Sequence, residues 1–367
     1  MSTTLTRTLL NGLDVGPLRL PNRVVMAPTT RARATNSALA PTELHAAYYG
    51  QRAGAGLIVT EGTWVSERAI GFLNVPGVYS EAQVAGWRRV TEVVHALGGR
   101  IVQQLWHAGA ASHPDHLGGE RPLGASAVDP GEKSFTAGGF KDTVTPRAMT
   151  LADIEKTVEE YRVASYNARR AGFDGVEIGA LGVSLPAQFL NPRLNLRTDA
   201  YGGDRARRRR LLLDVVDAAA AAWPGQGVGV RLSPYWDGGC FTPDASTLAD
   251  FDELVTALND LSGGGPVAYL HLRGPDLAGG DAPDPGAFAR YRRRFEGPLI
   301  VNNGFGRDSA DAAVAAGVAD AVSFATHFVA NPDLVSRFAL GRELATGDPA
   351  TYYQGGAEGY VDYPAAG

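Results

Sequence analysis

The feature that most constrains this fold is an alternation of short β-branched runs with longer stretches of helical period, repeated along the whole chain. Such runs are typical of buried parallel strands, and the stretches between them place apolar residues at helical spacing. Eight units in series predict an α/β fold, a closed (β/α)8 TIM barrel. The expected strands are 24–27, 57–60, 100–105, 175–178, 228–232, 268–272, 299–301 and 321–324. The expected helices are 42–53, 81–97, 151–171, 207–222, 248–261, 309–316 and 332–340.

A doubly wound sheet can be built from the same units, but its nucleotide-binding form places a glycine-rich turn after the first strand. Here that turn begins Pro28-Thr29-Thr30-Arg31 and contains no glycine. The sequence therefore favours one barrel domain over residues 1–367. Residues 107–149, after the third strand, are far longer than an ordinary connection and predict a lid over the barrel mouth.

Composition narrows the class of ligand. Lys and Arg number 34 against 39 Asp and Glu, which gives a net charge of -5 and argues against binding to nucleic acid or to an anionic membrane. The single cysteine, Cys240, and the lack of a signal or spanning segment predict a cytoplasmic protein. We therefore expect a small-molecule substrate and no metal, whereas the oligomeric state is left undetermined.

Barrel enzymes carry their chemistry where the strands end at the carboxyl side. Gln104 and Arg231 each end a strongly apolar run, where a purely structural role rarely requires an amide or a guanidinium. His107 and His271 also follow strands, but a histidine there is as often a hydrogen-bonded packing residue as a catalytic one. The sequence leaves both alternatives open for the two histidines.

A series of motifs in this chain resembles the Old Yellow Enzyme family. The matches run in order along nearly the whole sequence, so the resemblance covers one complete barrel. They are RVVMAPTTR at 23–31, TEG at 60–62, QLWH at 104–107, QFL at 188–190, RTDAYGG at 197–203, NPDL at 331–334 and GGAEGY at 355–360.

The resemblance implies an FMN at the barrel mouth that takes hydride from NAD(P)H and passes it to the β-carbon of an activated alkene. By position, the residues expected to contact the isoalloxazine and ribityl chain are Pro28, Thr30, Gly62, Gln104 and Arg231. The residues expected around the substrate pocket are Phe72, Trp106, Tyr235, Trp236 and Tyr353.

The chain departs from the family pattern at the substrate carbonyl. After the fourth strand the family supplies a histidine, an asparagine or histidine three residues later, and then a proton-donating tyrosine. The aligned residues here are Gly179, Gly182 and Ser184, which we also assign to the pocket. Loss of one preorganised oxyanion donor typically costs about 10²- to 10³-fold in rate, so ordinary enone reduction should be impaired.

A second departure lies at the FMN phosphate. Where the family has Gly-Arg after the eighth strand, this chain has Ala325 and Thr326. Loss of the charge-assisted hydrogen bond predicts FMN binding weaker by about 10- to 100-fold. Asn303, Gly304 and Thr326 remain as possible phosphate contacts.

Three hypotheses follow. The first is a barrel repurposed for a non-reductive isomerisation or cyclisation of a conjugated small molecule, in secondary metabolism, with weakened or lost use of FMN. The second is an FMN-dependent ene-reductase with an atypical substrate, which would use NAD(P)H only with FMN bound. The third is an inactive small-molecule-binding protein. The candidate catalytic residues, without assigned roles, are Arg231, His107, His271, Tyr353 and Ser184.

Overall fold

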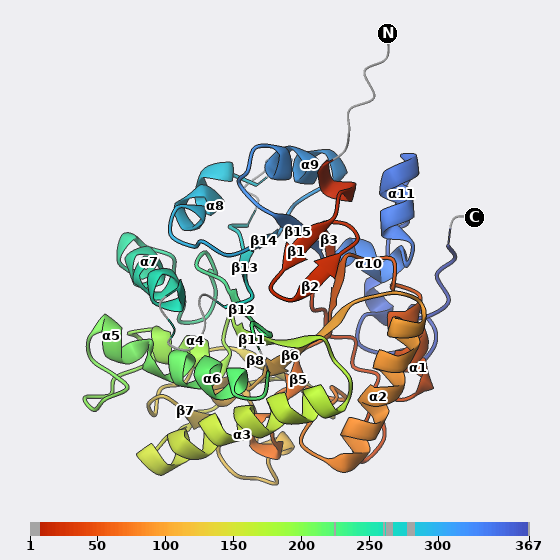
Figure 1. Cartoon of the computed structure of the whole chain (residues 1–367). Coiled ribbons are helices and arrows are strands. Elements are labelled where there is room, and N and C mark those ends of the chain that lie inside the picture. Colours follow the sequence, from red (N-terminus) through yellow and green to blue (C-terminus); the bar gives the residue numbers. More distant parts are fainter. Residues whose placement is uncertain (1–7, 224, 260, 262–266, 277–282, 366–367) are drawn as a thin grey trace.

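The computed structural model describes residues 8–223, 225–259, 261, 267–276 and 283–365. Within these ranges eight parallel strands pair side by side and close on themselves through β11 and β6, as the sequence predicts (Figure 1). The short strand β5 (Thr63–Trp64) adds to the edge of β6. The barrel strands are β3 (Val24–Met26), β4 (Leu57–Val59), β6 (Ile101–Trp106), β11 (Gly175–Ala180), β12 (Val228–Leu232), β13 (Tyr269–Arg273), β14 (Leu299–Asn302) and β15 (Ala321–Phe324).

Helices surround the strands. The seven predicted helical stretches all correspond to helix, although 207–222 is divided into α5 and α6 and the end of 248–261 lies partly outside the described residues. Three further helices, α4, α8 and α10, were not predicted. The first and last have only 6 and 5 residues, too few to show a helical period, whereas α8 is as long as the predicted α1. The α-helices are α1 (Glu43–Gly50), α2 (Glu81–Ala96), α3 (Leu151–Arg170), α4 (Leu185–Leu190), α5 (Arg205–Arg208), α6 (Arg210–Ala220), α7 (Ala245–Asn259), α8 (Pro285–Arg292), α9 (Arg307–Ala315), α10 (Thr326–Ala330) and α11 (Leu334–Leu340). Among the described helices, none has the length and apolar character needed to cross a bilayer.

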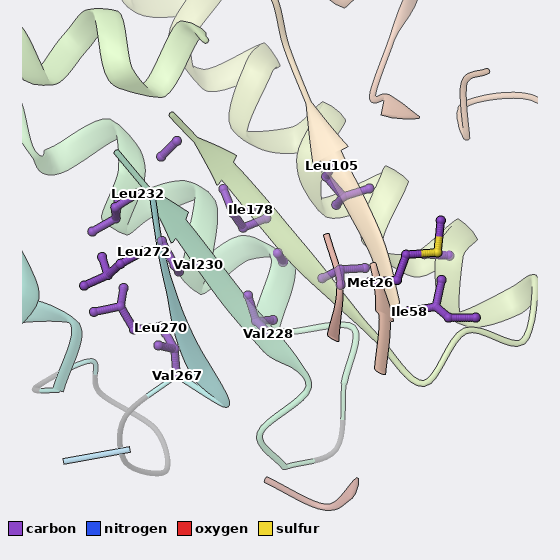
Figure 2. Close-up of a cluster of buried hydrophobic side chains, with 14 of the residues drawn as sticks. Met26, Ile58, Leu105, Ile178, Val228, Val230, Leu232, Val267, Leu270 and Leu272 are labelled. Carbon is purple, nitrogen blue, oxygen red and sulfur yellow. The ribbon is translucent and has the colours of Figure 1, made fainter. Parts of the chain in front are cut away.

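The core has two parts because successive side chains of a strand point to opposite faces. One face of each strand packs against the helices, as Ile178, Val230 and Leu272 show in Figure 2. The other face fills the barrel, where Val25, Val59 and similar residues form a separate apolar cluster. Polar residues on this inner face therefore lie inside the barrel or at its mouth.

One end of the barrel is covered by an antiparallel hairpin of β1 (Leu13–Val15) and β2 (Leu18–Leu20), drawn in red in Figure 1. Val15 and Leu20 belong to the inner apolar cluster. At its turn, Gly16 has a φ of 53°, and a Cβ there would lie 2.7 Å from the carbonyl oxygen of Gln226, just before β12 begins. The hairpin thus seals the amino-terminal end of the strands and leaves the carboxyl ends for the site.

The segment 107–149 folds as short turns and strands across the carboxyl end of β6. Its main element is a hairpin of β8 (Lys133–Thr136) and β9 (Gly139–Asp142), and the two-residue strands β7 (Leu123–Gly124) and β10 (Arg147–Ala148) pair at its base. Phe135 of the hairpin accepts a backbone hydrogen bond from Leu73 at 3.0 Å. The segment is therefore anchored to the loop that follows β5.

Candidate active site

A buried hydrogen-bond network fills the barrel interior below the strand ends. Gln104 Nε2 donates to Oε1 of Glu177 at 2.7 Å. His271 contacts the other oxygen, Oε2, through Nδ1 at 2.8 Å, and its Nε2 lies 2.7 Å from the hydroxyl of Ser323. Since a carboxylate only accepts, Nδ1 of His271 carries the proton and Ser323 donates to Nε2. Four strands are thereby joined across the barrel.

The network contains one negative and one positive side chain. Burial alone would raise the pKa of Glu177, but His271, Arg231 and Gln104 together outweigh burial and lower it. Burial lowers the pKa of His271, so a neutral imidazole faces an ionised carboxylate. Burial also lowers the pKa of Arg231 to about 10, which leaves this guanidinium protonated at neutral pH. Arg231 and Glu177 are the opposite charges of the network.

Arg231 is only partly satisfied by its neighbours. Its Nη2 donates to Oδ1 of Asn302 at 3.0 Å. Its Nε is buried and has no partner among the described residues. A buried donor without an acceptor is costly and calls for an explanation, which a bound polar ligand would provide. The side chain that the sequence singled out thus combines positive charge with an unused donor.

Gly62 and Gly179 flank the indole of Trp106 at the strand ends. A Cβ on either glycine would lie 3.0 Å from Cε3 of Trp106, and both positions also approach the amide of Gln104. The structure therefore brings together four predicted site residues, contributed by β6, by β11 and by the loop after β4. Where the family has a histidine, the space beside Gly179 is occupied by Trp106.

Gly182, where the family has the asparagine or histidine that holds the substrate carbonyl, lies beside the indole of Trp236. Its φ is 54°, and a Cβ there would lie 3.6 Å from the ring. The backbone N–H of Gly182 donates to Oγ of Ser233 at 2.8 Å, so it is not free for a ligand. No side chain at 179 or 182 can hold a carbonyl oxygen, and Trp236 stands at the predicted pocket.

Two residues predicted for the pocket have hydroxyl groups that are buried or bound to a helix. Ser184 precedes α4 and is fully buried, with no hydrogen-bond partner for its hydroxyl among the described residues. Tyr235 points to α8 instead, because its hydroxyl donates to the carbonyl of Ala287 at 3.0 Å and its ring packs on Tyr291. The hydroxyl of Ser184, to which the sequence assigned no role, is thus enclosed, and that of Tyr235 is held by α8. Their place in the pocket stays a prediction.

The two histidines that the sequence left open both occupy interior positions. Nδ1 of His107 accepts from the backbone N–H of Gly109 at 2.9 Å, and burial lowers the pKa of His107 to about 3. The imidazole is therefore neutral and stabilises the turn after β6. His271 is likewise buried, with both ring nitrogens engaged. The geometry favours the packing alternative for His271. For His107 both alternatives stay open, since its Nε2 is buried and has no partner among the described residues.

The predicted phosphate residues surround a cavity of about 290 Å³ at the ends of β14 and β15. Asn303 and Gly304 both have positive φ, 90° and 78°, which turns the chain sharply around one side. Ala325 and exposed Thr326 form part of the other side. The cavity has room for a ligand, and none of the described residues that line it is a lysine or an arginine.

An aromatic cluster of Phe72, Phe135, Phe140 and Tyr353 joins the loop after β5, the β8–β9 hairpin and the carboxyl-terminal segment. The ring of Phe72 lies 5.2 Å from that of Tyr353 and 5.0 Å from that of Phe135. Tyr353 is 41% exposed. Thus two predicted pocket residues, Phe72 and Tyr353, contact each other and the segment 107–149.

Glu61, in the loop after β4, is a second buried carboxylate near the mouth. Its Oε2 accepts from the backbone N–H of Arg31 at 3.2 Å, whereas Oε1 has no partner among the described residues. Burial raises the pKa of Glu61 to about 7, because the backbone hydrogen bonds and nearby arginines only partly offset the desolvation. It is the buried acid whose charge changes near neutral pH.

Sequence reasoning missed Glu177 and Arg273. Glu177 interrupts the apolar run of β11, and Arg273 ends β13, the same kind of position that identified Arg231. A charged residue inside or at the end of a buried strand was the available signal. The structure adds that Arg273 Cζ lies 5.0 Å from the ring centroid of Trp236.

The chain is similar to known proteins along nearly its whole length. The model of the NADH:flavin oxidoreductase / NADH oxidase family matches residues 8–345. Flavin oxidoreductase hxnT of Emericella nidulans is 36% identical, over 98% of this chain and 97% of the relative. The rice (Oryza sativa subsp. japonica) 12-oxophytodienoate reductase 1 is 36% identical, over 97% of this chain and 92% of the relative.

Among solved structures, morphinone reductase is 42% identical and superimposes with a TM-score of 0.92, covering 99% of this chain and 97% of that chain. The predicted Old Yellow Enzyme resemblance and barrel fold are thus confirmed. A likeness of this extent, together with the family match along most of the sequence, settles membership. The chain belongs to the NADH:flavin oxidoreductase / NADH oxidase family.

Proposed function

We propose that the protein is an FMN-dependent, NAD(P)H-driven oxidoreductase that reduces the double bond of an activated alkene. The matched relatives are named as reductases and oxidoreductases, and one solved structure is of morphinone reductase in complex with tetrahydroNAD. The observation that carries the proposal is the Gln104–Glu177–Arg231 arrangement, which leaves a buried cationic donor at the mouth. The proposal is the second of the three sequence hypotheses.

The residues present fit the pyrimidine edge of a flavin. Because Nε2 of Gln104 is committed to Glu177, the oxygen of the Gln104 amide is the atom left to accept from a ring N–H. The unpartnered Nε of Arg231 is suited to a ring carbonyl, and its positive charge stabilises negative charge there. The hydroxyl of half-buried Thr30 is a further donor, and Pro28 and Gly62 are likewise only partly buried. A bound FMN supplies the chemistry that these side chains lack, since it accepts hydride from a nicotinamide and delivers it to carbon.

The phosphate end of the site fits FMN less tightly. The cavity between β14 and β15 has the space, and Asn303, Gly304 and Thr326 offer backbone and hydroxyl groups around it. Without an arginine, however, the phosphate charge is met only by dipoles and neutral groups. We therefore propose that FMN binds here with reduced affinity.

The substrate end lacks the expected side chains for holding a carbonyl. Gly179 and Gly182 provide none, and Ser184 is buried. Trp106, Trp236, Phe72 and Tyr353 offer flat apolar or aromatic surfaces, which suit a conjugated acceptor. We propose that residues 107–149 cap this pocket within a single barrel domain and exclude water from it.

The non-reductive hypothesis has less support. It was suggested by the joint change at the carbonyl and phosphate positions. In the structure these positions indeed offer no side chain for a carbonyl and no charge for a phosphate. Yet the network that would tune a flavin is intact and buried, and the relatives named above are reductases and oxidoreductases. An isomerase or cyclase would not require that network.

The test is the visible absorption of the protein as purified, and again after incubation with excess FMN and removal of the unbound fraction. We expect a flavin band near 450 nm in the second sample that NADH or NADPH bleaches without oxygen, from the known chromophore of flavins. Arg231→Gln should lower the flavin retained, whereas Arg162→Gln, on the exposed face of α3, serves as the matched control. Protein that stays colourless after FMN loading would return the non-reductive hypothesis to first place.

A further inference from the structure

Arg273 continues the inner face of β13 to the mouth of the barrel. Tyr269 lies in the inner apolar cluster and His271 contacts Glu177 inside the barrel, whereas Leu270 and Leu272 pack outward under the helices (Figure 2). Since side chains alternate along a strand, Arg273 belongs to the same face as His271, one step closer to the mouth. It is paired in register with Asn302 of β14.

The guanidinium of Arg273 contacts two parts of the mouth. Its acceptor Asp276 also accepts from Nδ2 of Asn303, which lines the predicted phosphate cavity, at 3.1 Å, and its other neighbour is Trp236. Cζ of Arg273 is 5.0 Å from the ring centroid of Trp236. The same indole lies 3.6 Å from the position that a Cβ on Gly182 would take. One aromatic ring therefore connects Arg273 with the glycine that replaces a carbonyl-binding residue.

One end of this guanidinium has no acceptor. Nη2 donates to Asp276, but Nη1 is buried and has no partner among the described residues. The side chain is only 17% exposed, whereas Asp276 is 67% exposed, so solvent weakens the ion pair between them. Arg273 thus presents a desolvated donor whose charge is incompletely neutralised.

The neighbouring charges add to the positive potential. Burial is the main cause that lowers the pKa of Arg231, and the positive charge of nearby Arg273 lowers it further. Glu177 neutralises Arg231 inside the barrel, and no further carboxylate of the described residues forms an ion pair with Arg273. Two guanidinium groups at one mouth, with one well-placed counter-charge, attract an anion.

We propose that Arg273 anchors the substrate, and that the substrate is a conjugated enone that carries a carboxylate. In this arrangement Nη1 of Arg273 donates to the carboxylate, and the indole of Trp236 lies along the conjugated system. The anchor takes over the binding role for which Gly179 and Gly182 have no side chain. This inference rests on the proposed function and names the substrate class of that site.

The experiment uses the FMN-loaded protein with two matched probes, 2-cyclohexenone and 3-oxocyclohex-1-ene-1-carboxylate. Dissociation constants are read from the change that each probe causes in the visible flavin spectrum, without nicotinamide and at constant ionic strength. A charge-assisted contact predicts that the carboxylate probe binds about 10- to 100-fold more tightly than the neutral one. Steady-state rates then separate KM from kcat for both probes.

Arg273→Gln should remove this preference by raising the dissociation constant and KM of the carboxylate probe by about 10- to 100-fold. Binding of 2-cyclohexenone and retention of FMN should stay within about threefold, because neither depends on the lost charge. Arg273→Lys should restore part of the preference, since it keeps the charge but loses the planar fork. Arg162→Gln controls for the change in net charge.

Three results would overturn the inference. The wild type could bind both probes equally, Arg273→Gln could weaken both to the same extent, or Arg273→Gln could release FMN, which would assign Arg273 to the cofactor. If the wild type retains no FMN, the proposed function fails on that ground. Calorimetry with the carboxylate probe then still measures whether its binding requires Arg273, so the two failures remain distinguishable.

Discussion

The two sides of the barrel mouth differ in how completely their polar groups are matched. On the side formed by β6, β11, β12 and β13, the buried groups of Gln104, Glu177 and His271 are joined by hydrogen bonds of 2.7 and 2.8 Å. On the side formed by β14 and β15, a cavity of about 290 Å³ is lined by neutral residues, including Ala325 and Thr326. A substitution on the first side leaves a buried partner unsatisfied, whereas Thr326 on the second side is exposed, so a change there disturbs fewer buried contacts.

The difference between the two sides indicates which residues of the site can be substituted without loss of stability. A buried charge that loses its partner destabilises the whole fold, so the charges inside the barrel must stay together or change together. A residue that faces a solvent-filled cavity or the pocket affects only the ligand. Of the five departures of this chain from its family, Gly179 and Gly182 lie beside Trp106 and Trp236, Ala325 and Thr326 line the cavity, and Ser184 is buried. None of them replaces a member of the Gln104–Glu177–His271 network.

The largest effect is expected from breaking the paired side. Glu177→Gln leaves the buried charge of Arg231 without its counter-ion and should lower the free energy of unfolding by about 3 to 5 kcal/mol. Urea unfolding followed by circular dichroism measures this, with Glu159→Gln on the exposed face of α3 as the control. A Glu177→Gln protein as stable as the wild type would show that the network is not charge-paired.

Glu61 sharpens the comparison because it is buried without the contacts that stabilise the charge of Glu177. Since its pKa is raised from 4.5 to about 7, the folded state binds its proton more tightly than the unfolded state does. The contribution of protonated Glu61 to the free energy of unfolding is complete below about pH 4.5 and is lost as pH rises through about 7.

The difference in unfolding free energy between wild type and Glu61→Gln should therefore shift by about 3 kcal/mol between pH 4.5 and 8, to the disadvantage of the wild type at high pH. Urea unfolding of both proteins at a series of pH values measures the shift. Parallel pH profiles for the two proteins would contradict the assignment of this titration to Glu61.

On the open side, adding charge should improve ligand binding with little effect on folding. Thr326 is exposed at the phosphate cavity, so Thr326→Arg should tighten FMN binding by about 10- to 100-fold. Equilibrium dialysis against FMN measures the affinity, and riboflavin, which lacks the phosphate, is the control ligand. An equal gain for riboflavin would mean that the new arginine does not meet the phosphate.

The smallest effect is expected at Ser184. Its hydroxyl is buried and unpartnered, so Ser184→Ala removes a desolvated polar group and should change stability by only about 1 kcal/mol or less. Turnover with the best alkene substrate should stay within about threefold. A loss of turnover beyond tenfold, with KM unchanged, would instead give Ser184 a role in the chemical step.

The sequence predicted the architecture well, because strand and helix periods are local properties of the chain. The eight runs correspond to the eight barrel strands, and the polar ends of two of them, Gln104 and Arg231, lie at the mouth. The absence of side chains at Gly179 and Gly182 could also be known from sequence alone. What remained open was how each polar group is partnered.

Sequence determined the barrel, the family resemblance and the positions where this chain departs from it, since all three depend on the order of residue types. Tertiary structure decided that Glu177 joins Gln104 to His271, that Tyr235 points to α8, and that Arg273 reaches Trp236. These contacts join strands and loops far apart in the chain. Their formation depends on the register and curvature of the closed barrel, which set the side-chain distances that no local pattern records.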